Sequence, residues 1–260
     1  MKQFDHLGPP RLVTSHLSPS VNAATSQIGE KSAIEMQWAQ SPDNSMLHLE
    51  SKGWTLMAER RHLSIDEARA LYGEVVDSTH DFDHVMRVYR LAERIGQAEG
   101  ADMPVLRTAC LLHDIARADQ ETGRVPDHAA EGACRARDLL SARPPQFVDA
   151  VAHAIAAHRF RGDDVQPRTL EARILYDADK LDAIGAVGIA RAFCYGAHQG
   201  QPLWGPPDVD THTPAKEFAV KLSKIKDMLF TETARAMAEE RHHFMVQFFQ
   251  RMAAEVSGQA

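Results

Sequence analysis

Apolar residues recur at helical spacing along most of the chain after Ser64, and this periodicity limits the choice of folds. Within residues 82–98, for example, Val85, Val88 and Ile95 fall on one face of a helix. No segment shows the sustained alternation of apolar and polar residues that indicates a half-buried strand, and the sequence has no internal repeat. The pattern therefore predicts an all-α fold, in which helices pack on helices in a bundle.

Capping residues, prolines and glycines divide this periodic region into separate helices. Ser64 and Glu67 form a capping box, which opens a short helix through about Val75. Three glycines and three prolines indicate a loop over residues 196–212. The other predicted helices span residues 82–98, 104–117, 129–141, 145–159, 169–195, 213–230 and 232–256.

The first part of the chain differs in character from the rest. Residues 1–56 are rich in Ser, Pro, Gln, Asn and His and lack sustained periodicity of either kind. Such segments bury too little apolar surface to fold by themselves. We therefore expect a flexible or loosely packed extension over residues 1–56 and one domain over residues 57–260. Met46 and Met57 lie near this boundary, so a translation start assigned too early would equally explain the extension.

The overall charge and hydropathy argue against several classes of function. The 260 residues carry a net charge of −7, so no overall basic field favours nucleic acid or an anionic membrane as a partner. Arg107 and Arg191 interrupt the longest apolar stretches, which are too short to span a membrane. The N-terminus also lacks the pattern of a secretory signal. We expect a cytoplasmic protein without nucleic acid or membrane partners, and the oligomeric state stays open.

The three cysteines are Cys110, Cys134 and Cys194, an odd number without a CxxC pair. Two of them lie within apolar segments. This pattern predicts two buried free thiols in a reducing compartment rather than disulfides.

The segment TACLLHDIARAD, residues 108–119, places His113 and Asp114 side by side after an apolar run. Ionisable groups at the edge of a core raise the free energy of the fold unless something compensates them. His84 and Asp179 also lie beside apolar positions, so helix packing could bring all four groups together. Histidine and aspartate are common ligands of divalent metals, and four of them leave coordination positions for water and substrate.

Three segments resemble the H…HD…D signature of the HD-domain metal-dependent phosphohydrolases. They are HDFDHVMRV, LLHDIAR and DADKLDAIGAVGIARAF, in this order, and the likeness extends from about residue 64 to the end. The segment KEFAVKLSKIKDMLFTETARAMAEERHHFMVQFF also resembles the helical tail of a subgroup that includes bacterial and archaeal nucleotide pyrophosphohydrolases. The resemblance implies a single helical HD domain with the metal ligands His84, His113, Asp114 and Asp179.

The resemblance also bears on how the metal is held. The last ligand of the family directly precedes a basic–apolar pair, which begins here at Lys180, so it indicates Asp179 rather than Asp177. Asp177 and Asp182 would then support the ligands or lie on a helix surface. The ligand types suit one divalent transition metal, namely manganese, nickel, cobalt or iron, with magnesium as an alternative.

Some HD families bind a second metal through further histidines, and His128 and His158 stand near those positions. The two-metal dinucleotide phosphodiesterases carry an adjacent HH pair and a GYP segment, and the di-iron oxygenases carry a lysine shortly after HD. None of these features occurs between His84 and Asp179, and Ala116–Arg117 follows the HD pair. We therefore expect one metal, with His128 and His158 in the pocket as proton donors or phosphate contacts. His153 is less well placed, because it cannot easily point to the same spot as His158 on a helix.

We also predict roles for several basic side chains and glycines. Lys180 faces substrate phosphate in the resemblance, and Arg117, one turn beyond His113, would do the same. Arg87 is expected to form a structural salt bridge. We expect a polar face of the last helix at Arg241, His242 and His243, and close helix packing at Gly185 and Gly188.

The resulting expectation is a phosphohydrolase that cleaves a phosphoester or phosphoanhydride bond of a small-molecule phosphate ester, a nucleotide above all, with a metal-activated water. Asp114 would hold the metal and accept the proton of the water. Three alternatives stay open, namely a 5′-nucleotidase-type phosphomonoesterase, a di-iron HD oxygenase and a non-catalytic nucleotide-binding regulator.

Overall fold

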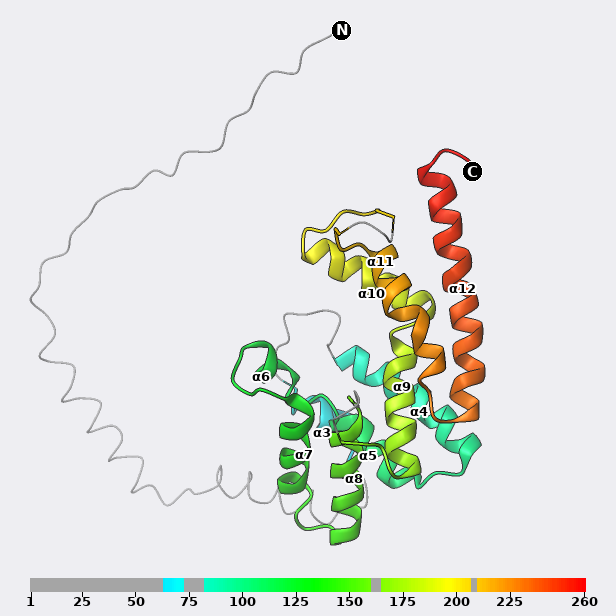
Figure 1. Ribbon diagram of the computed structural model, residues 1–260. Coiled ribbons are helices and arrows are strands. Elements are labelled where there is room, and N and C mark those ends of the chain that lie inside the picture. The colour runs from blue at the N-terminus through cyan, green and yellow to red at the C-terminus, as the bar shows by residue number, and fades with distance from the viewer. Residues whose placement is uncertain (1–62, 73–81, 160–164, 207–209) are drawn as a thin grey trace, which may run out of the picture. The chain divides into compact units, whose positions relative to one another are not determined.

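The computed structural model describes residues 63–72, 82–159, 165–206 and 210–260 (Figure 1). Every regular element in these ranges is a helix, which confirms the predicted all-α fold. The division between residues 1–56 and 57–260 stays a prediction, since it falls outside the described residues. The elements are α3 (Ile65–Arg69), α4 (Phe82–Glu99), α5 (Met103–Leu112), α6 (Arg117–Glu121), α7 (His128–Leu139), α8 (Pro145–Ala157), α9 (Leu170–Asp182), α10 (Gly185–His198), α11 (Pro214–Val220), the 3-10 helix η1 (Leu222–Asp227) and α12 (Glu232–Val256).

Side-chain caps fix where several helices begin. The Ser64 hydroxyl accepts a hydrogen bond from the Glu67 amide at 3.2 Å, and the Ser64 amide donates to the Glu67 carboxylate at 2.9 Å. This confirms the predicted capping box, although α3 ends at Arg69 and residues 73–75 lie outside the described part. Threonine side chains cap three further helices, at Thr169, Thr213 and Thr231.

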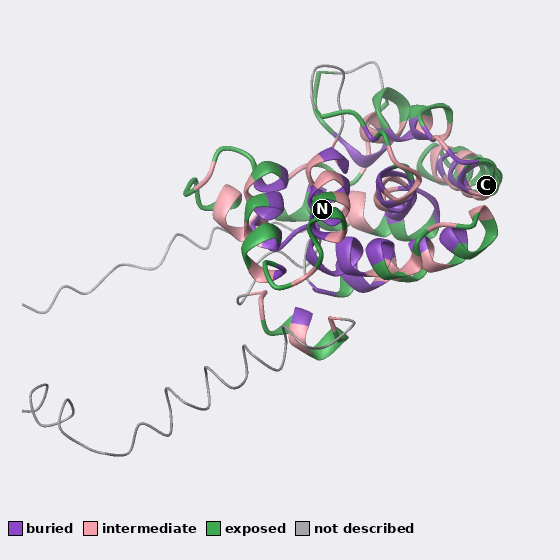
Figure 2. Cartoon of the chain, turned by 90° about the horizontal axis from the view of Figure 1, so that it is seen from below, coloured by how far each residue is buried: buried purple, intermediate pink, exposed green. Residues whose placement is uncertain are grey.

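The core forms where α4, α5, α8 and α9 pack against one another, with α7 on α8. Its fully buried side chains include Tyr176 and aliphatic ones such as Ile95, Leu106, Ile155 and Leu175. Figure 2 shows the buried residues on the sides of these helices that face each other. The polar residues of the site sit at the edge of this core, so neighbouring helices hold them in place from several sides.

The segment after α5 departs from the prediction. A helix was expected over residues 104–117, but α5 ends at Leu112, with His113 as its C-cap. His113 folds its ring back, so that its Nδ1 lies 2.8 Å from the Cys110 carbonyl. The turn that follows lets the HD pair face the interior before α6 begins at Arg117.

The predicted helix over residues 169–195 is two helices, because the chain breaks between α9 and α10. Gly185 has a φ of +79°, a value that residues with a Cβ rarely adopt, and an added Cβ would lie 3.0 Å from the Arg241 Cγ. A Cβ at Gly188 would lie 2.2 Å from the Ala183 carbonyl oxygen. Both glycines therefore permit close packing as predicted, and Gly185 also lies at the break between the two helices.

The structure also differs from the prediction over residues 196–230. The start of the expected loop over residues 196–212 is displaced, since α10 continues to His198. The helix expected over residues 213–230 is divided into α11 and η1 at Lys221, whose φ of −130° does not suit an α-helix. These breaks place α10, α11 and η1 as separate short elements around one end of α9 (Figure 1).

Asp177 anchors the start of α12 and supports no ligand. Its buried carboxylate accepts hydrogen bonds from the amides of Phe230 and Thr231 at 2.9 and 2.8 Å, and from the Thr231 hydroxyl at 2.8 Å. Both roles considered for Asp177 from the sequence are therefore wrong. The carboxylate satisfies backbone donors at a helix N-terminus, which have no partner within the helix.

Only one of the cysteines is buried. Cys110 lies in the core, whereas Cys134 and Cys194 are exposed, so the expectation of two buried thiols is wrong. All three are free thiols. In the described part of the chain, no helix combines the length and the apolar character that crossing a membrane requires.

Candidate metal centre

The four predicted ligands come together from three parts of the fold. His84 lies on α4, His113 and Asp114 follow α5, and Asp179 lies on α9. The His84 Nε2 is 3.4 Å from the Asp179 Oδ1 and 3.7 Å from the Asp114 Oδ2. The His113 Nε2 is also 3.7 Å from the Asp114 Oδ2. Atoms at such separations can share one ion, since ion-to-ligand distances are about 2.0 to 2.3 Å.

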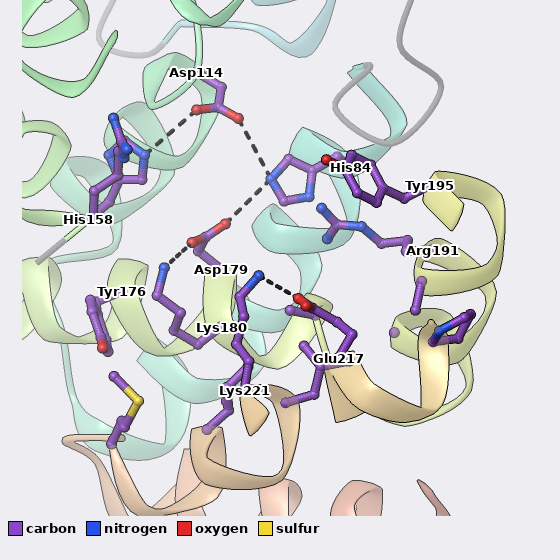
Figure 3. Close-up of a pocket in the computed structure, with 18 of the residues that line it drawn as sticks. His84, Asp114, His158, Tyr176, Asp179, Lys180, Arg191, Tyr195, Glu217 and Lys221 are labelled. Carbon is purple, nitrogen blue, oxygen red and sulfur yellow. Dashed lines mark hydrogen bonds and ion pairs between the residues drawn. The ribbon is translucent and has the colours of Figure 1, made fainter. Parts of the chain in front are cut away.

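Two further histidines face the other oxygen of Asp114. The Nε2 atoms of His128 and His158 lie 3.0 and 3.6 Å from the Asp114 Oδ1, and 3.3 Å from each other. Asp114 therefore stands between two groups of potential ligands, one on each side of its carboxylate, and Figure 3 shows it between His84 and His158. His153 lies outside this cluster, where its Nε2 accepts a hydrogen bond from the Arg168 amide at 3.1 Å.

Each of the four histidines is held through its Nδ1 atom, which leaves Nε2 directed at the centre. This arrangement is typical of histidines that ligate metals, because the second bond fixes the tautomer and the ring orientation. His113 and His158 both follow the last residue of a helix, so the carbonyl three residues earlier can accept from Nδ1. The Nδ1 partners are Asp182 for His84, the Cys110 carbonyl for His113, Gln120 for His128 and the Ile155 carbonyl for His158.

Two buried atoms of the cluster lack the partner that burial normally demands. The His113 Nε2 and the Asp114 Oδ1 make no hydrogen bond within the described part of the chain, although the His128 Nε2 approaches the latter to 3.0 Å. A buried polar atom without a partner costs about 1 to 3 kcal/mol. A cation beside either atom would give it a partner, so the residues present fit a metal ion.

The pKa values point in the same direction. Burial lowers the pKa of His84, but hydrogen bonds to Asp179 and Asp182 outweigh it and raise this pKa to about 9. Burial also raises the pKa of Asp114, but the nearby His113 and His128 outweigh it and hold this pKa well below its usual range. A proton on His84 thus lies between ionised carboxylates, at a place that suits positive charge. Burial lowers the pKa of His113 to about 4, so its ring is neutral and able to ligate.

Asp182 fixes the position of His84. Its buried carboxylate lies 2.8 Å from the His84 Nδ1, 2.8 Å from the Arg87 Nε and 2.7 Å from a guanidinium nitrogen of Arg191. Of the two roles considered for Asp182, the geometry agrees with support of a ligand and excludes a surface carboxylate. It also confirms the structural salt bridge expected for Arg87.

A cavity of about 790 Å³ opens beside these ligands. Five basic side chains and three carboxylates line it, in a chain whose net charge is −7. The predicted phosphate contacts are both in its wall, with the Lys180 Nζ 2.8 Å from the Asp179 Oδ2 and the Arg117 Nε 2.8 Å from Glu121. The basic residues are Arg117, Arg159, Lys180, Arg191 and Lys221, and the carboxylates are Asp114, Asp179 and Glu217.

The sequence did not lead us to Arg191 and Tyr195 in the cavity wall, and it led to a wrong expectation for Arg241. Arg191 and Tyr195 lie three and seven residues after Gly188 on α10, so all three share the helix face toward the cavity. That spacing could have revealed them. Arg241 was expected on a polar face, but it is partly buried and donates a hydrogen bond to the Leu181 carbonyl.

Comparisons with known proteins agree with this geometry. Residues 81–184 match the family model of the HD domain. The chain is 38% identical to the YpgQ protein of Bacillus subtilis over 186 residues, which are 70% of this chain and 86% of YpgQ. A stretch of 115 residues, 44% of this chain, is 36% identical to ribonuclease Y of Thermoanaerobacter pseudethanolicus but covers only 20% of that protein.

Solved structures show the same relationship. The crystal structure of Bacillus subtilis YpgQ in complex with ADP has a TM-score of 0.60 and 35% identity, covering 76% of this chain and all of that one. A predicted HD superfamily hydrolase from an uncultured Thermotogales bacterium has a TM-score of 0.56 and 36% identity, covering 74% and 90%. The described fold and the likeness over most of YpgQ lead to one conclusion: this chain belongs to the HD superfamily of metal-dependent hydrolases.

Proposed function

We propose that this protein is a nucleotide phosphohydrolase that cleaves a phosphoanhydride bond of a nucleoside polyphosphate. The observation that carries the proposal is the basic wall of the cavity, directly beside a metal-ligand cluster. A nucleoside triphosphate brings several negative charges, and a cavity of about 790 Å³ has the size of a small-molecule site. A phosphomonoester carries fewer charges and would leave part of this basic wall unused.

We assign His84, His113, Asp114 and Asp179 as the ligands of one divalent ion, for which manganese, nickel, cobalt, iron and magnesium are the candidates. When bound, such an ion lowers the pKa of water and offsets the charge of phosphoryl oxygens. Asp114 is the residue that we assign to orient the attacking water, because it lines the cavity and its Oδ1 lies toward His128 and His158. A proton accepted there can pass to the His128 Nε2, 3.0 Å away.

In the proposed reaction the water oxygen bonds to a phosphorus atom, and the bond from that phosphorus to the bridging oxygen breaks. The leaving phosphate takes the electron pair, and so its negative charge increases. Lys180 and Arg117 would stabilise that charge, since cations directed at developing charge supply much of the catalysis in phosphoryl transfer. Lys180 is held in place by Asp179 and by the Tyr176 ring, whose centroid lies 5.0 Å from the Nζ.

The ADP complex of YpgQ supports a nucleotide as the ligand class. That complex concerns a relative of 35% identity, and it is the reason to test nucleotides before other phosphate esters.

A second candidate follows from the position of His128 and His158. Both point at the free oxygen of Asp114, so a second ion would find three ligand atoms there. Such a pair of ions is what the di-iron oxygenase alternative requires. Metal analysis of the purified protein separates the two, since the proposed hydrolase needs one ion per chain.

The test is the release of phosphate and pyrophosphate from nucleoside tri-, di- and monophosphates, with Mn²⁺, Ni²⁺, Co²⁺ and Mg²⁺ in turn. Monophosphate formed from a polyphosphate, and lost in Asp114→Ala, is the expected result. Orthophosphate from monophosphates alone would replace the proposal by the nucleotidase alternative. Cleavage of an RNA oligonucleotide without turnover of nucleotides would instead point to an activity like that of ribonuclease Y.

A further inference from the structure

The cavity has two unlike ends, which lie on opposite sides of the metal centre. One end is formed by α6 and the C-terminal end of α8, and it presents Arg117, His158 and Arg159. The other end is formed by α10, the loop after it and α11, and it presents Arg191, Tyr195, Glu217 and Lys221 among its polar groups. In Figure 3, His158 and Tyr195 lie on opposite sides of Asp179, so a ligand that fills the cavity spans both ends.

Specific contacts hold the α10–α11 end of the cavity together. An added Cβ at Gly196 would lie 3.3 Å from the Gln201 Oε1 and 3.7 Å from the Pro214 Cγ, so the missing side chain lets both approach. The Gln201 amide donates to the Gly196 carbonyl at 2.8 Å and folds the loop back onto the last turn of α10. Tyr195, directly before Gly196, is therefore held beside the start of α11.

Tyr195 offers a partly exposed aromatic ring to the cavity. Its side chain is 50% exposed although it lines the cavity. No ring of the described residues packs on it, whereas Phe193 of the same helix stacks on Phe249 and meets Phe248 edge to face. An exposed aromatic ring in the wall of a cavity is suited to stack on another flat ring.

The charged groups of this end pair with one another, and the two arginines of the other end also have carboxylate partners, Glu121 at 2.8 Å from Arg117 and Asp127 at 3.3 Å from Arg159. The two oxygens of Glu217 are taken up by the His212 Nε2 at 3.1 Å and the Lys221 Nζ at 2.6 Å. Beyond them, Leu222 and Ile225 of η1 add apolar wall. An end with paired charges, apolar wall and an exposed aromatic ring suits a nucleobase and its sugar, and the two guanidinium groups of the arginine end suit phosphates.

We propose that the α10–α11 end binds the nucleoside, with the base stacked on Tyr195, while the phosphates extend across the metal centre toward Arg117 and Arg159. This inference rests on the proposed nucleotide phosphohydrolase function and adds the orientation of the substrate. It makes Tyr195 a specificity-determining residue, since its ring meets only the part of the substrate that does not react.

The experiment compares substrates with and without a base. The kcat/KM values for ATP, GTP, CTP and TTP are divided by the value for inorganic tripolyphosphate, which has the anhydride bonds but no nucleoside. In Tyr195→Ala this ratio should fall by about tenfold or more, as expected for the loss of one base–aromatic stack. Tyr195→Phe should keep the ratio, because it keeps the ring face.

Phe244→Ala is the matched control, since Phe244 is a 47% exposed aromatic residue of α12 outside the cavity wall. Its ratio should equal that of the wild type. An unchanged ratio in Tyr195→Ala would overturn the nucleoside assignment, whether kcat/KM stays the same for both kinds of substrate or falls equally for both. Failure of the wild-type protein to hydrolyse any nucleotide would overturn the proposed function and this inference with it, so the two failures are distinguishable.

Discussion

The metal centre and the α10–α11 end of the cavity are built in contrasting ways. At the centre, His84, His113 and Asp114 are each at most 4% exposed, and every ring is fixed by a second hydrogen bond. At the other end, Tyr195 is half exposed and stands on a helix that a glycine separates from α9. The difference suggests a division of work, in which the buried region performs the reaction and the exposed region selects the substrate. Changes in the first should affect all substrates alike.

The strongest test of this division is Asp114→Asn. The amide keeps the shape but removes the charge that faces both groups of histidines, so turnover of every substrate should fall by at least about 10³-fold. Metal ions should raise the melting temperature of the wild-type protein, because they bind the folded state, and this rise should be lost in the variant. Asp138→Asn changes an exposed aspartate of α7 and should alter neither property. Turnover near the wild-type rate would contradict the central role of Asp114.

Lys180→Met should have the next largest effect. The substitution keeps most of the side-chain volume and removes a cation beside Asp179, so kcat/KM should fall by about 10²-fold for nucleotides and tripolyphosphate alike. Lys224→Met is the control, since Lys224 is an exposed residue of η1 outside the cavity wall. A loss confined to nucleotides would place Lys180 with the residues that select the substrate and would contradict the division between the two regions.

The reacting region is also the one that local sequence patterns could predict. His84, His113, Asp114 and Asp179 each stand beside apolar residues of a strongly periodic helix, and the structure brings these four together. Helical periodicity fixes which face of a helix is buried, so polar residues at the edge of that face must meet in the interior. The supporting role of Asp182 was left open, because spacing alone does not tell which neighbour a carboxylate binds.

The selecting region could not be predicted, because its shape depends on contacts between distant segments. The helical periodicity runs from residue 169 to residue 195 without interruption. The helix nevertheless breaks before Gly185, where the backbone has a positive φ and Arg241 packs closely. Likewise, Asp177 binds the start of α12, a partner that no local pattern reveals. Arg191 and Tyr195 point into the cavity only as a consequence of that break.

Asp182→Asn tests how far the reacting region depends on its support. The variant weakens the bond that orients His84, so affinity for the activating metal should fall by about 10- to 100-fold. Saturating metal should restore much of the turnover, while the ratio of nucleotide to tripolyphosphate hydrolysis should stay constant. Metal titration with calorimetry measures the affinity, and an unchanged value would mean that His84 needs no such anchor.

The smallest effect is expected from Gly185→Ala, which acts on the joint between the two regions. A left-handed backbone costs about 1 to 2 kcal/mol in any residue with a Cβ, and here the new methyl group would also press on Arg241. Gly100→Ala is the matched control, because Gly100 has a φ of +75° but nothing within 4 Å of the added Cβ. Both variants should lower the melting temperature by a few degrees, and Gly185→Ala should lower it further. Only Gly185→Ala should also change the substrate ratio, since it moves α10 and Tyr195 relative to α9. Equal ratios in the two variants would mean that the joint contributes stability alone, and that the selecting end tolerates such movement.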